Sequence, residues 1–517
     1  MSWSSAVCRW GVFMGRKLGA AGGEYCLTRF LLLRLLGSVY LVAFWVAVRQ
    51  LPALIGADGL TPVGLFFERV VTHYGGTWEA FREMPSVFWL NHSDAALLAV
   101  AWLGVVLSAV VVLGYANGVM LLVLWASYLS IVHVGQEWYG YGWEIQLPET
   151  GFLAVFLVPL WDGRPWTQRS PPILVIWLYR WLLFRVMFGA GMIKLRGDDA
   201  WADLTALYYH FETQPIPNAL SRWYHFLPRW ILQSGVLFNH AVELVMPWLL
   251  FGPRRIRHGA GIAIVVFHLL IISSGNLSFL NWLTLVPAVA CFDDRFWGRI
   301  CPPLGRRREQ VQPVPSRFMM GAGGVLACVV VALSLAPARN LMLPGQRMNS
   351  SFNAPKLVNT YGNFGSVGRE RYTVVFEGTT AARLDHQTEW IAYPYWALPV
   401  ALDEIPPQIA PYQPHFDWQM WFAAMGTYQR YPWTLNLVWK LLHNDPTAVR
   451  LFGDNPFASE PPRYVRAVLY RYEFVPATRE SQRIWDRTPV DLWLPPLSRN
   501  SPALVDFLRV HGWIESR

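Results

Sequence analysis

Apolar segments about as long as a bilayer is thick follow one another through the first two thirds of this chain. A transmembrane helix needs about 20 mostly apolar residues. Nine segments meet or approach this length: Thr28–Arg49, Ala95–Gly114, Gly118–Val134, Ile145–Trp161, Ile173–Leu195, Gly235–Phe251, Gly259–Ser274, Asn276–Phe292 and Phe318–Ala336. Of the 517 residues, 54% are hydrophobic and only 15% are charged, whereas soluble domains average about 25% charged residues. The sequence therefore predicts a multi-pass helical membrane domain over residues 28–337, preceded by a cytoplasmic segment, residues 1–27.

Two of these regions have more than one interpretation. Ile145–Trp161 contains Glu149 and two prolines, so it is either a span or a re-entrant segment. The region Gly259–Phe292 favours a tight helical hairpin that turns at Ser273–Asn276.

Basic residues collect in alternate loops of this nine-span arrangement. With the N-terminus inside, the cytoplasmic loops contain Arg9, Arg16, Lys17, Arg164, Arg169, Arg254, Arg255, Arg257, Arg306, Arg307 and Arg308. The opposite loops Gln136–Glu144 and Ser273–Asn276 contain no Lys or Arg. The positive-inside rule then predicts a cytoplasmic N-terminus and an extracytoplasmic C-terminal part. Because the charge of +9 is dispersed among short loops instead of covering one soluble face, we expect no nucleic-acid partner.

Residues 338–517 predict a second, soluble domain of the α+β class. Three segments rich in β-branched and aromatic residues predict strands: Arg371–Glu377, Glu389–Trp396 and Val465–Val475. Three segments with helical periodicity predict helices: Asp417–Thr427, Leu435–His443 and Ala503–His511. Leu341–Gly345 is the expected connection between the two domains.

Known catalytic and metal-binding patterns are missing from the sequence. The five cysteines show no metal-ligand spacing, and there is no Gly-x-Ser-x-Gly elbow, His-Glu-x-x-His pair or P-loop. We therefore expect neither a metal nor a cofactor.

Ionisable residues at the end of one apolar segment are the strongest candidates for a functional site. Lys194 ends the segment Ile173–Leu195, and Asp198 and Asp199 follow it. Charged groups at that depth must be paired or hydrated. Lys194 is either an anchoring lysine paired with the aspartates or a desolvated base.

Two further pairs of titratable residues follow Lys194. His210 and Glu212 are two residues apart and can share one side of an extended segment; they either shape a long loop or take part in catalysis. His240 and Glu243 are three residues apart on one helical face. They form either a structural network, with each other or with Lys194, or a proton-handling site.

The predicted soluble domain has two motifs of interest. Tyr361–Arg371 contains three glycines and an Arg-Glu-Arg triplet that leads into a strand. Pro411–Trp421 leads into a helix with Asp417 as a plausible N-cap, and its tryptophans belong either to the core or to a binding surface.

Several long motifs resemble the lipase maturation factor family in the same order along the chain. They are Arg185–Asp198, Tyr209–Asn218, Asn276–Leu285, Tyr361–Glu370, Asp417–Phe422 and Val465–Tyr470. The resemblance implies a multi-pass protein whose animal relatives lie in the endoplasmic reticulum membrane and help secreted lipases to fold and assemble. For a bacterial source, the inner or cell membrane would take that place and the client would be unknown.

The membrane half is also similar to vitamin K-dependent gamma-carboxylases over Gly189–Leu195 and Trp201. Lys194 would match the lysine proposed as the base there, although the spacing to Trp201 is longer.

These observations lead to one main hypothesis and one alternative. The main hypothesis is a membrane-anchored maturation factor whose partners are secreted, lipase-like clients and the bilayer; it requires no catalytic residue. Its candidate client-binding residues are Tyr361, Phe364, Arg369, Asp417, Trp418 and Trp421. The alternative is a membrane enzyme acting on a lipophilic substrate or cofactor, with Lys194 as base and assistance from His210, Glu212, His240 or Glu243.

Overall fold

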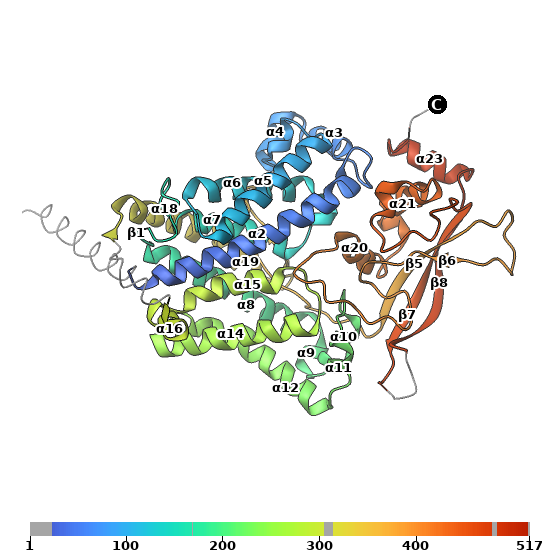
Figure 1. Ribbon diagram of the computed structural model, residues 1–517. Helices are drawn as coiled ribbons and strands as arrows, with labels where there is room; N and C mark the ends of the chain where they lie inside the picture. The colour runs from blue at the N-terminus through green and yellow to red at the C-terminus, as the bar shows by residue number, and fades with distance from the viewer. Residues whose placement is uncertain (1–22, 168, 304–313, 478–482, 515–517) are drawn as a thin grey trace, which may run out of the picture.

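A helical bundle and a C-terminal region built around a β-sheet lie end to end in the computed structural model (Figure 1). The structure describes residues 23–167, 169–303, 314–477 and 483–514. The helices of the first part are α2 (Cys26–Ile55), α3 (Val63–Tyr74), α4 (Thr77–Glu83), α5 (Asp94–Leu113), α6 (Gly118–Val134), α7 (Gly142–Val155), α8 (Ile173–Gly197), α9 (Asp199–Ala202), α10 (Leu207–Thr213), α11 (Ser221–His225), α12 (Arg229–His240), α13 (Met246–Leu249), α14 (Arg254–Ser274), α15 (Leu280–Ala288), α16 (Asp294–Ile300), α18 (Arg317–Leu333) and α19 (Leu335–Met342).

Five helical stretches in the part of the chain that the structure describes are long and apolar enough to cross a membrane. They are α2, α5, α8, α14 and the stretch Arg317–Met342, which comprises α18 and α19. Two shorter apolar helices, α6 and Leu280–Cys291, accompany them. The predicted fold class, a multi-pass helical membrane domain followed by an α+β region, is confirmed. The count of nine spans and the exact domain bounds stay predictions.

The two remaining predicted spans form less regular elements. Helix α7 has 14 residues and includes Pro148, so at 1.5 Å per residue it extends about 21 Å, less than the ~30 Å hydrocarbon core. The segment Gly235–Phe251 consists of α12, a π-helical turn (Ala241–Val245) and α13. The predicted helical hairpin is present: α14 ends at Ser274 and α15 begins at Leu280.

The two ends of the bundle differ in chemistry. At the end remote from the sheet, the Asp294 carboxylate accepts hydrogen bonds from the backbone N–H groups of Cys26 and Leu27, at 2.9 and 2.8 Å. Arg254 there pairs with Asp293 at 2.6 Å. These residues and the predicted basic loop Arg254–Arg257 are thus at the end opposite the C-terminal region (Figure 1). The basic residues of 1–22 and 304–313 in the charge argument lie outside the described residues.

Glycines set the close packing of α2 against α5. A Cβ on Gly104 of α5 would lie 2.2 Å from the Phe44 ring of α2, and a Cβ on Gly37 would lie 2.9 Å from Val111. The Phe44 ring also packs edge-on against Tyr128 of α6, with the ring centroids 5.3 Å apart. A missing side chain on each helix therefore lets α2 and α5 touch along their length.

The C-terminal region contains an antiparallel sheet in the order β6-β5-β7-β8. Helices α20 and α21 cover the face of the sheet that looks toward the bundle (Figure 1). The elements are β3 (Ser350–Ser351), β4 (Asn359–Thr360), β5 (Arg371–Thr379), β6 (Ile391–Ala392), α20 (His415–Ala423), α21 (Trp433–Leu442), α22 (Pro446–Val449), β7 (Tyr464–Phe474), β8 (Trp485–Leu497) and α23 (Pro502–Val510). Strands β1 (Arg169–Ser170) and β2 (Val314–Pro315) form a separate pair.

The strand predictions are confirmed in two of three cases. Strands β5 and β7 match them, but only Ile391–Ala392 of the predicted strand Glu389–Trp396 pairs with a neighbour. Strand β8 was not predicted. Three prolines, at 489, 495 and 496, argue against a central strand, and they are tolerated because β8 lies at the edge of the sheet.

All three predicted C-terminal helices are present, with shifted ends. Helix α20 begins at His415, two residues before the predicted start, and its N-cap is Pro414. The prediction that Asp417 caps this helix is therefore wrong. Asp417 lies inside the first turn, and its carboxylate accepts hydrogen bonds from the backbone N–H groups of Ala397 (2.7 Å) and Leu398 (3.2 Å). It ties α20 to a separate loop.

We expect Gly104→Ala to destabilise the bundle by about 1–3 kcal/mol, the usual cost of overpacking, because the new methyl group would overlap the Phe44 ring. Gly259→Ala is the matched control: it lies in α14 with nothing within 4 Å of an added Cβ. Thermal unfolding of both variants in detergent measures the difference. Equal melting temperatures would contradict the packing argument.

Candidate functional site at the junction of the two halves

Polar side chains join the C-terminal region to the outer end of the bundle, at a contact that we call the junction. Arg371, at the start of β5, is only 1% exposed. Its guanidinium donates to the carbonyl oxygens of Gln214 (2.5 Å), Pro215 (3.0 Å) and Glu212 (3.1 Å). These carbonyls belong to the C-terminal end of α10 and the residues after it, where the helix dipole favours a cation. Arg371 thereby connects the sheet to the end of α10 and to the segment that follows it.

A second ion pair closes the junction beside α8. Asp198 caps α9 by accepting from Ala200 N–H at 3.0 Å, and its other oxygen accepts from Val367 N–H at 2.9 Å. Arg369 binds the same carboxylate at 2.8 Å. The hydrogen bond from Arg369 lowers the pKa of Asp198 to about 2, so this carboxylate is ionised throughout the neutral range. Trp201 adds a hydrogen bond from its indole N–H to Phe364 O, at 2.9 Å.

Buried amide side chains of the bundle bind the main chain of the C-terminal region. The Asn276 side-chain oxygen accepts from Ile409 and Ala410 N–H, both at 2.9 Å, and its NH₂ donates to Pro407 O at 2.7 Å. At the end of α2, Gln50 donates to Gln413 O at 2.7 Å and accepts from the N–H of His415. An amide can donate and accept at once, so each side chain satisfies backbone groups of both kinds.

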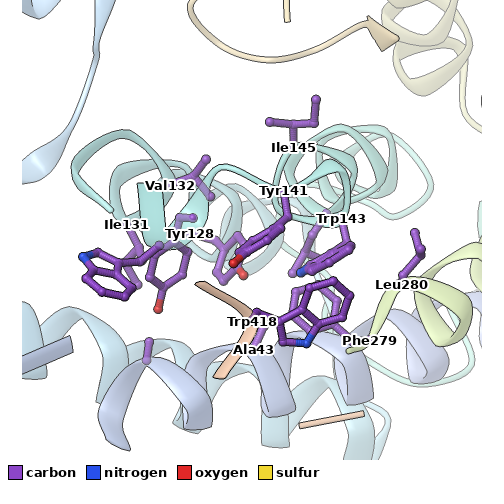
Figure 2. Close-up of a cluster of buried hydrophobic side chains, with 14 of the residues drawn as sticks. Ala43, Tyr128, Ile131, Val132, Tyr141, Trp143, Ile145, Phe279, Leu280 and Trp418 are labelled. Atoms are coloured by element: carbon purple, nitrogen blue, oxygen red, sulfur yellow. The ribbon is translucent and has the colours of Figure 1, made fainter. Parts of the chain in front are cut away.

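A cavity of about 500 Å³ lies within the junction. Aromatic side chains form one wall: Tyr141 and Trp143 stack with their ring centroids 4.7 Å apart, and Trp418 packs edge-on against Trp143 at 4.9 Å. Figure 2 shows these three rings together, with Trp418 of α20 facing the two rings at the start of α7. The loop of residues 362–368 forms another wall. Both halves of the chain therefore build the cavity.

Lys194 belongs to a buried network below the junction. Its ammonium donates to Glu243 at 2.6 Å and to Asn239 at 2.9 Å, and it lies 4.7 Å from the centre of the Trp201 ring. Lys194 and Glu243 are 5% and 4% exposed. The lysine therefore pairs with Glu243, and the interpretation that paired it with Asp198 and Asp199 is wrong. A glycine at position 191 allows this approach, because a Cβ there would lie 3.0 Å from the Glu243 side chain.

His210, Glu212 and His240 make no hydrogen bond or ion pair with Lys194 or Glu243 among the described residues, and the His240 ring contacts this network through Trp201. His210 and Glu212 are in helix α10, not in an extended segment as predicted. The His210 ring lines the cavity and packs edge-on against Phe364 at 4.8 Å; burial lowers its pKa to about 4, so it is neutral at pH 7. Glu212 accepts from Phe474 N–H at 2.7 Å. His240 Nε2 lies 3.0 Å from the carbonyl oxygen of Trp201.

Among the described residues, Lys194 and Glu243 are the only two of the five proposed catalytic groups that form a polar contact with each other. The described residues also contain no group of three or more His, Cys, Asp or Glu side chains that could hold a metal ion. The ion pair with Glu243 accounts for the buried lysine without a reaction.

The six candidate client-binding residues divide by burial. Tyr361, Asp417 and Trp418 are buried, and the Tyr361 hydroxyl donates to Glu149 at 2.6 Å. Phe364 and Trp421 are partly exposed and line the cavity, while Arg369 holds Asp198. Phe364, Trp421 and Arg369 therefore keep part of their surface accessible, whereas Tyr361, Asp417 and Trp418 are largely enclosed in the junction.

Sequence reasoning did not identify Gln50, Trp143 or Asn276 as junction residues. Gln50 and Gln413 are 363 residues apart, and such a pairing leaves no local pattern. The one available signal was an amide side chain at the end of an apolar segment, where it must find a partner.

Two family models match this chain, one over the bundle and one over the C-terminal region. The lipase maturation factor transmembrane domain matches residues 27–299. The chain belongs to the lipase maturation factor family. The family's C-terminal domain matches residues 357–495, the region that contains Arg371 and the sheet.

Relatives cover nearly the whole chain. Lipase maturation factor 1 from Bos taurus is 43% identical over 512 residues, which is 94% of this chain and 91% of the relative. The protein of the same name from Homo sapiens is 40% identical over 518 residues, 95% and 91% of the two chains. Lipase maturation factor 2 from Homo sapiens is 29% identical over 614 residues, 94% and 85%. No solved structure matches the chain.

The Lys194 network generates a test by paired substitution. Lys194→Met leaves the Glu243 carboxylate buried without its cation, and we expect a loss of about 3–5 kcal/mol. The double variant Lys194→Met/Glu243→Leu removes both charges and should recover most of that loss. Unfolding in detergent micelles measures both. If the double variant folds normally but does not support lipase secretion, the lysine has a chemical role and the structural interpretation fails.

Asp417 predicts a pH dependence of stability. Burial raises its pKa to about 7, against about 3.9 in an unfolded chain. From about pH 4 to pH 7 the folded protein holds a proton that the unfolded chain has released, so the free energy of unfolding falls as pH rises through this window. Asp417→Asn should flatten this slope, whereas Asp454→Asn, at an exposed site, should not. An unchanged slope in Asp417→Asn would contradict the assignment.

Proposed function

We propose that this chain is a membrane-anchored maturation factor that helps secreted lipases reach their folded, assembled state. The strongest support for this proposal is the 43% identity to Lipase maturation factor 1 from Bos taurus over 94% of this chain. The similarity includes the bundle, the C-terminal region and the segments that meet at the junction. We infer that both halves act together.

The C-terminal region is the part that would engage the client. It carries large apolar side chains on its surface: Trp396, Met425 and Ile405 are 56%, 59% and 62% exposed. An incompletely folded protein exposes apolar surface of its own, against which exposed apolar side chains of this kind can pack.

The charge pattern supports an extracytoplasmic position for this region. Arg254 and Arg257 lie at the opposite end of the bundle, where both approach Asp293. By the positive-inside rule that end faces the cytoplasm. The C-terminal region would then face the lumen of the endoplasmic reticulum in a eukaryotic cell, or the outer side of the cell membrane in a bacterium. Secreted clients pass through either compartment.

Restoring lipase secretion tests the proposal. In cells from which the mammalian factor has been deleted, the full chain should restore the activity of a secreted lipase, while a chain ending at residue 337 should not. Full activity from the membrane half alone, or none from the full chain, would contradict the proposal.

A point variant gives the sharper version of this test. Arg371→Met leaves the carbonyls of residues 212, 214 and 215 without their donor, and each hydrogen bond to a charged group contributes about 1.5–3 kcal/mol. We expect this variant to lose most of the restored secretion. Arg463→Met, an exposed arginine of the same region, is the matched control and should behave as the unchanged chain.

A further inference from the structure

The contacts that hold the two halves together leave a cavity between them. Its volume of about 500 Å³ lies in the range of sites that enclose most of a small ligand's surface. Lining residues at positions 366, 368, 370 and 425 are exposed, so the cavity opens to solvent beside the C-terminal region.

The inner wall of the cavity is apolar and held in place. Tyr141 and Trp143 are 7% and 3% exposed and are fixed by the stack that they form with each other and by Trp418. His210 also lines the cavity, against Phe364, and is neutral at pH 7 because burial lowers its pKa to about 4. An apolar surface that is already ordered loses little conformational freedom when an apolar group binds to it.

The loop of residues 362–368 forms a second wall of the cavity. Gly362 and Gly365 pack so closely on α8 that a Cβ at either position would lie 3.0 or 2.9 Å from Ile193. The loop of residues 362–368 lines the cavity with the Phe364 ring, the exposed Ser366 and its own backbone, and within the described residues the peptide groups of Asn363 and Ser366 make no main-chain hydrogen bond. Two methionines, Met348 and Met425, complete the lining, and methionine adapts to apolar groups of different shape.

We propose that this cavity binds an extended segment of an incompletely folded polypeptide, with large apolar side chains against the aromatic wall and its main chain along the 362–368 loop. Peptide groups hydrogen-bond other peptide groups, as in strand addition, whereas a lipid acyl chain would leave this polar wall without partners. The flexible methionines allow many sequences to bind. This inference rests on the proposed function and names the surface through which a client would be held.

Position 368 offers a way to fill the cavity. A Cβ on Gly368 would meet Glu370 O at 3.5 Å and Thr213 Cβ at 3.8 Å, both ordinary contacts, and both residues line the cavity. Gly368→Trp should therefore occupy the space without disturbing the loop. Gly345→Trp is the matched control, because nothing lies within 4 Å of an added Cβ there.

The probe is a fluorescein-labelled peptide of about ten residues that alternates phenylalanine and serine, the period of an extended strand. Fluorescence anisotropy with the full-length protein in detergent should show binding that Gly368→Trp weakens at least about tenfold and Gly345→Trp leaves unchanged. The same peptide with alanine in place of phenylalanine should bind at least about tenfold more weakly. A photo-crosslinking residue at Met425 of the otherwise unchanged chain should label the phenylalanine peptide, which tests the site without filling it.

Two outcomes would overturn the inference. The first is peptide binding that Gly368→Trp does not change. The second is that the unchanged chain binds a fluorescent phospholipid but not the peptide, and that Gly368→Trp weakens binding of the phospholipid. Secretion of a lipase by the unchanged chain separates this result from the proposed function: secretion without peptide binding removes the cavity inference alone, and absence of secretion removes the maturation role.

Discussion

Hydrogen bonds from buried side chains to main-chain groups of the other half hold this protein together. Arg371, Asn276 and Gln50 each bind carbonyl or amide groups that would otherwise be left without partners inside the junction. An unpaired buried polar group costs about 1–3 kcal/mol, so these contacts are worth most when all are made at once. The result is a definite orientation of the sheet relative to the bundle, which apolar contact alone does not specify.

The sequence was most informative where one local pattern decides the structure. Runs such as Ala95–Gly114 are too long and too apolar for any element but a membrane helix, and α5 follows that prediction. The β-branched and aromatic residues of β5 and β7 likewise predicted strands. It was least informative where tertiary contact decides. An edge position admits the prolines of β8, and α10 is helical although Pro215 and Pro217 follow it so closely.

The candidate site shows the same division. Lys194 and Glu243 were identified as groups that need partners, and the structure joins them; periodicity could not reveal that Asn239 and Trp201 complete the network. Phe364 and Trp421 were named from a motif and do line the cavity, but Trp143, which forms its inner wall, lies in Gln136–Glu144, which was considered only as a loop without basic residues. Chemistry-bearing residue types are visible in a sequence, whereas the space between them is a property of the fold.

The junction also determines when the protein can be completed during synthesis. The carbonyls of residues 212–215 are synthesised long before Arg371. Gln50 can form its hydrogen bond only after Gln413, 363 residues further along the chain, has been synthesised. The last sheet strand, β8, pairs with β7 only when residue 497 has left the ribosome. Until then the bundle presents an unfinished outer surface. A chain that stops before residue 371 lacks the guanidinium that binds the carbonyls of residues 212, 214 and 215, so its bundle cannot complete this surface.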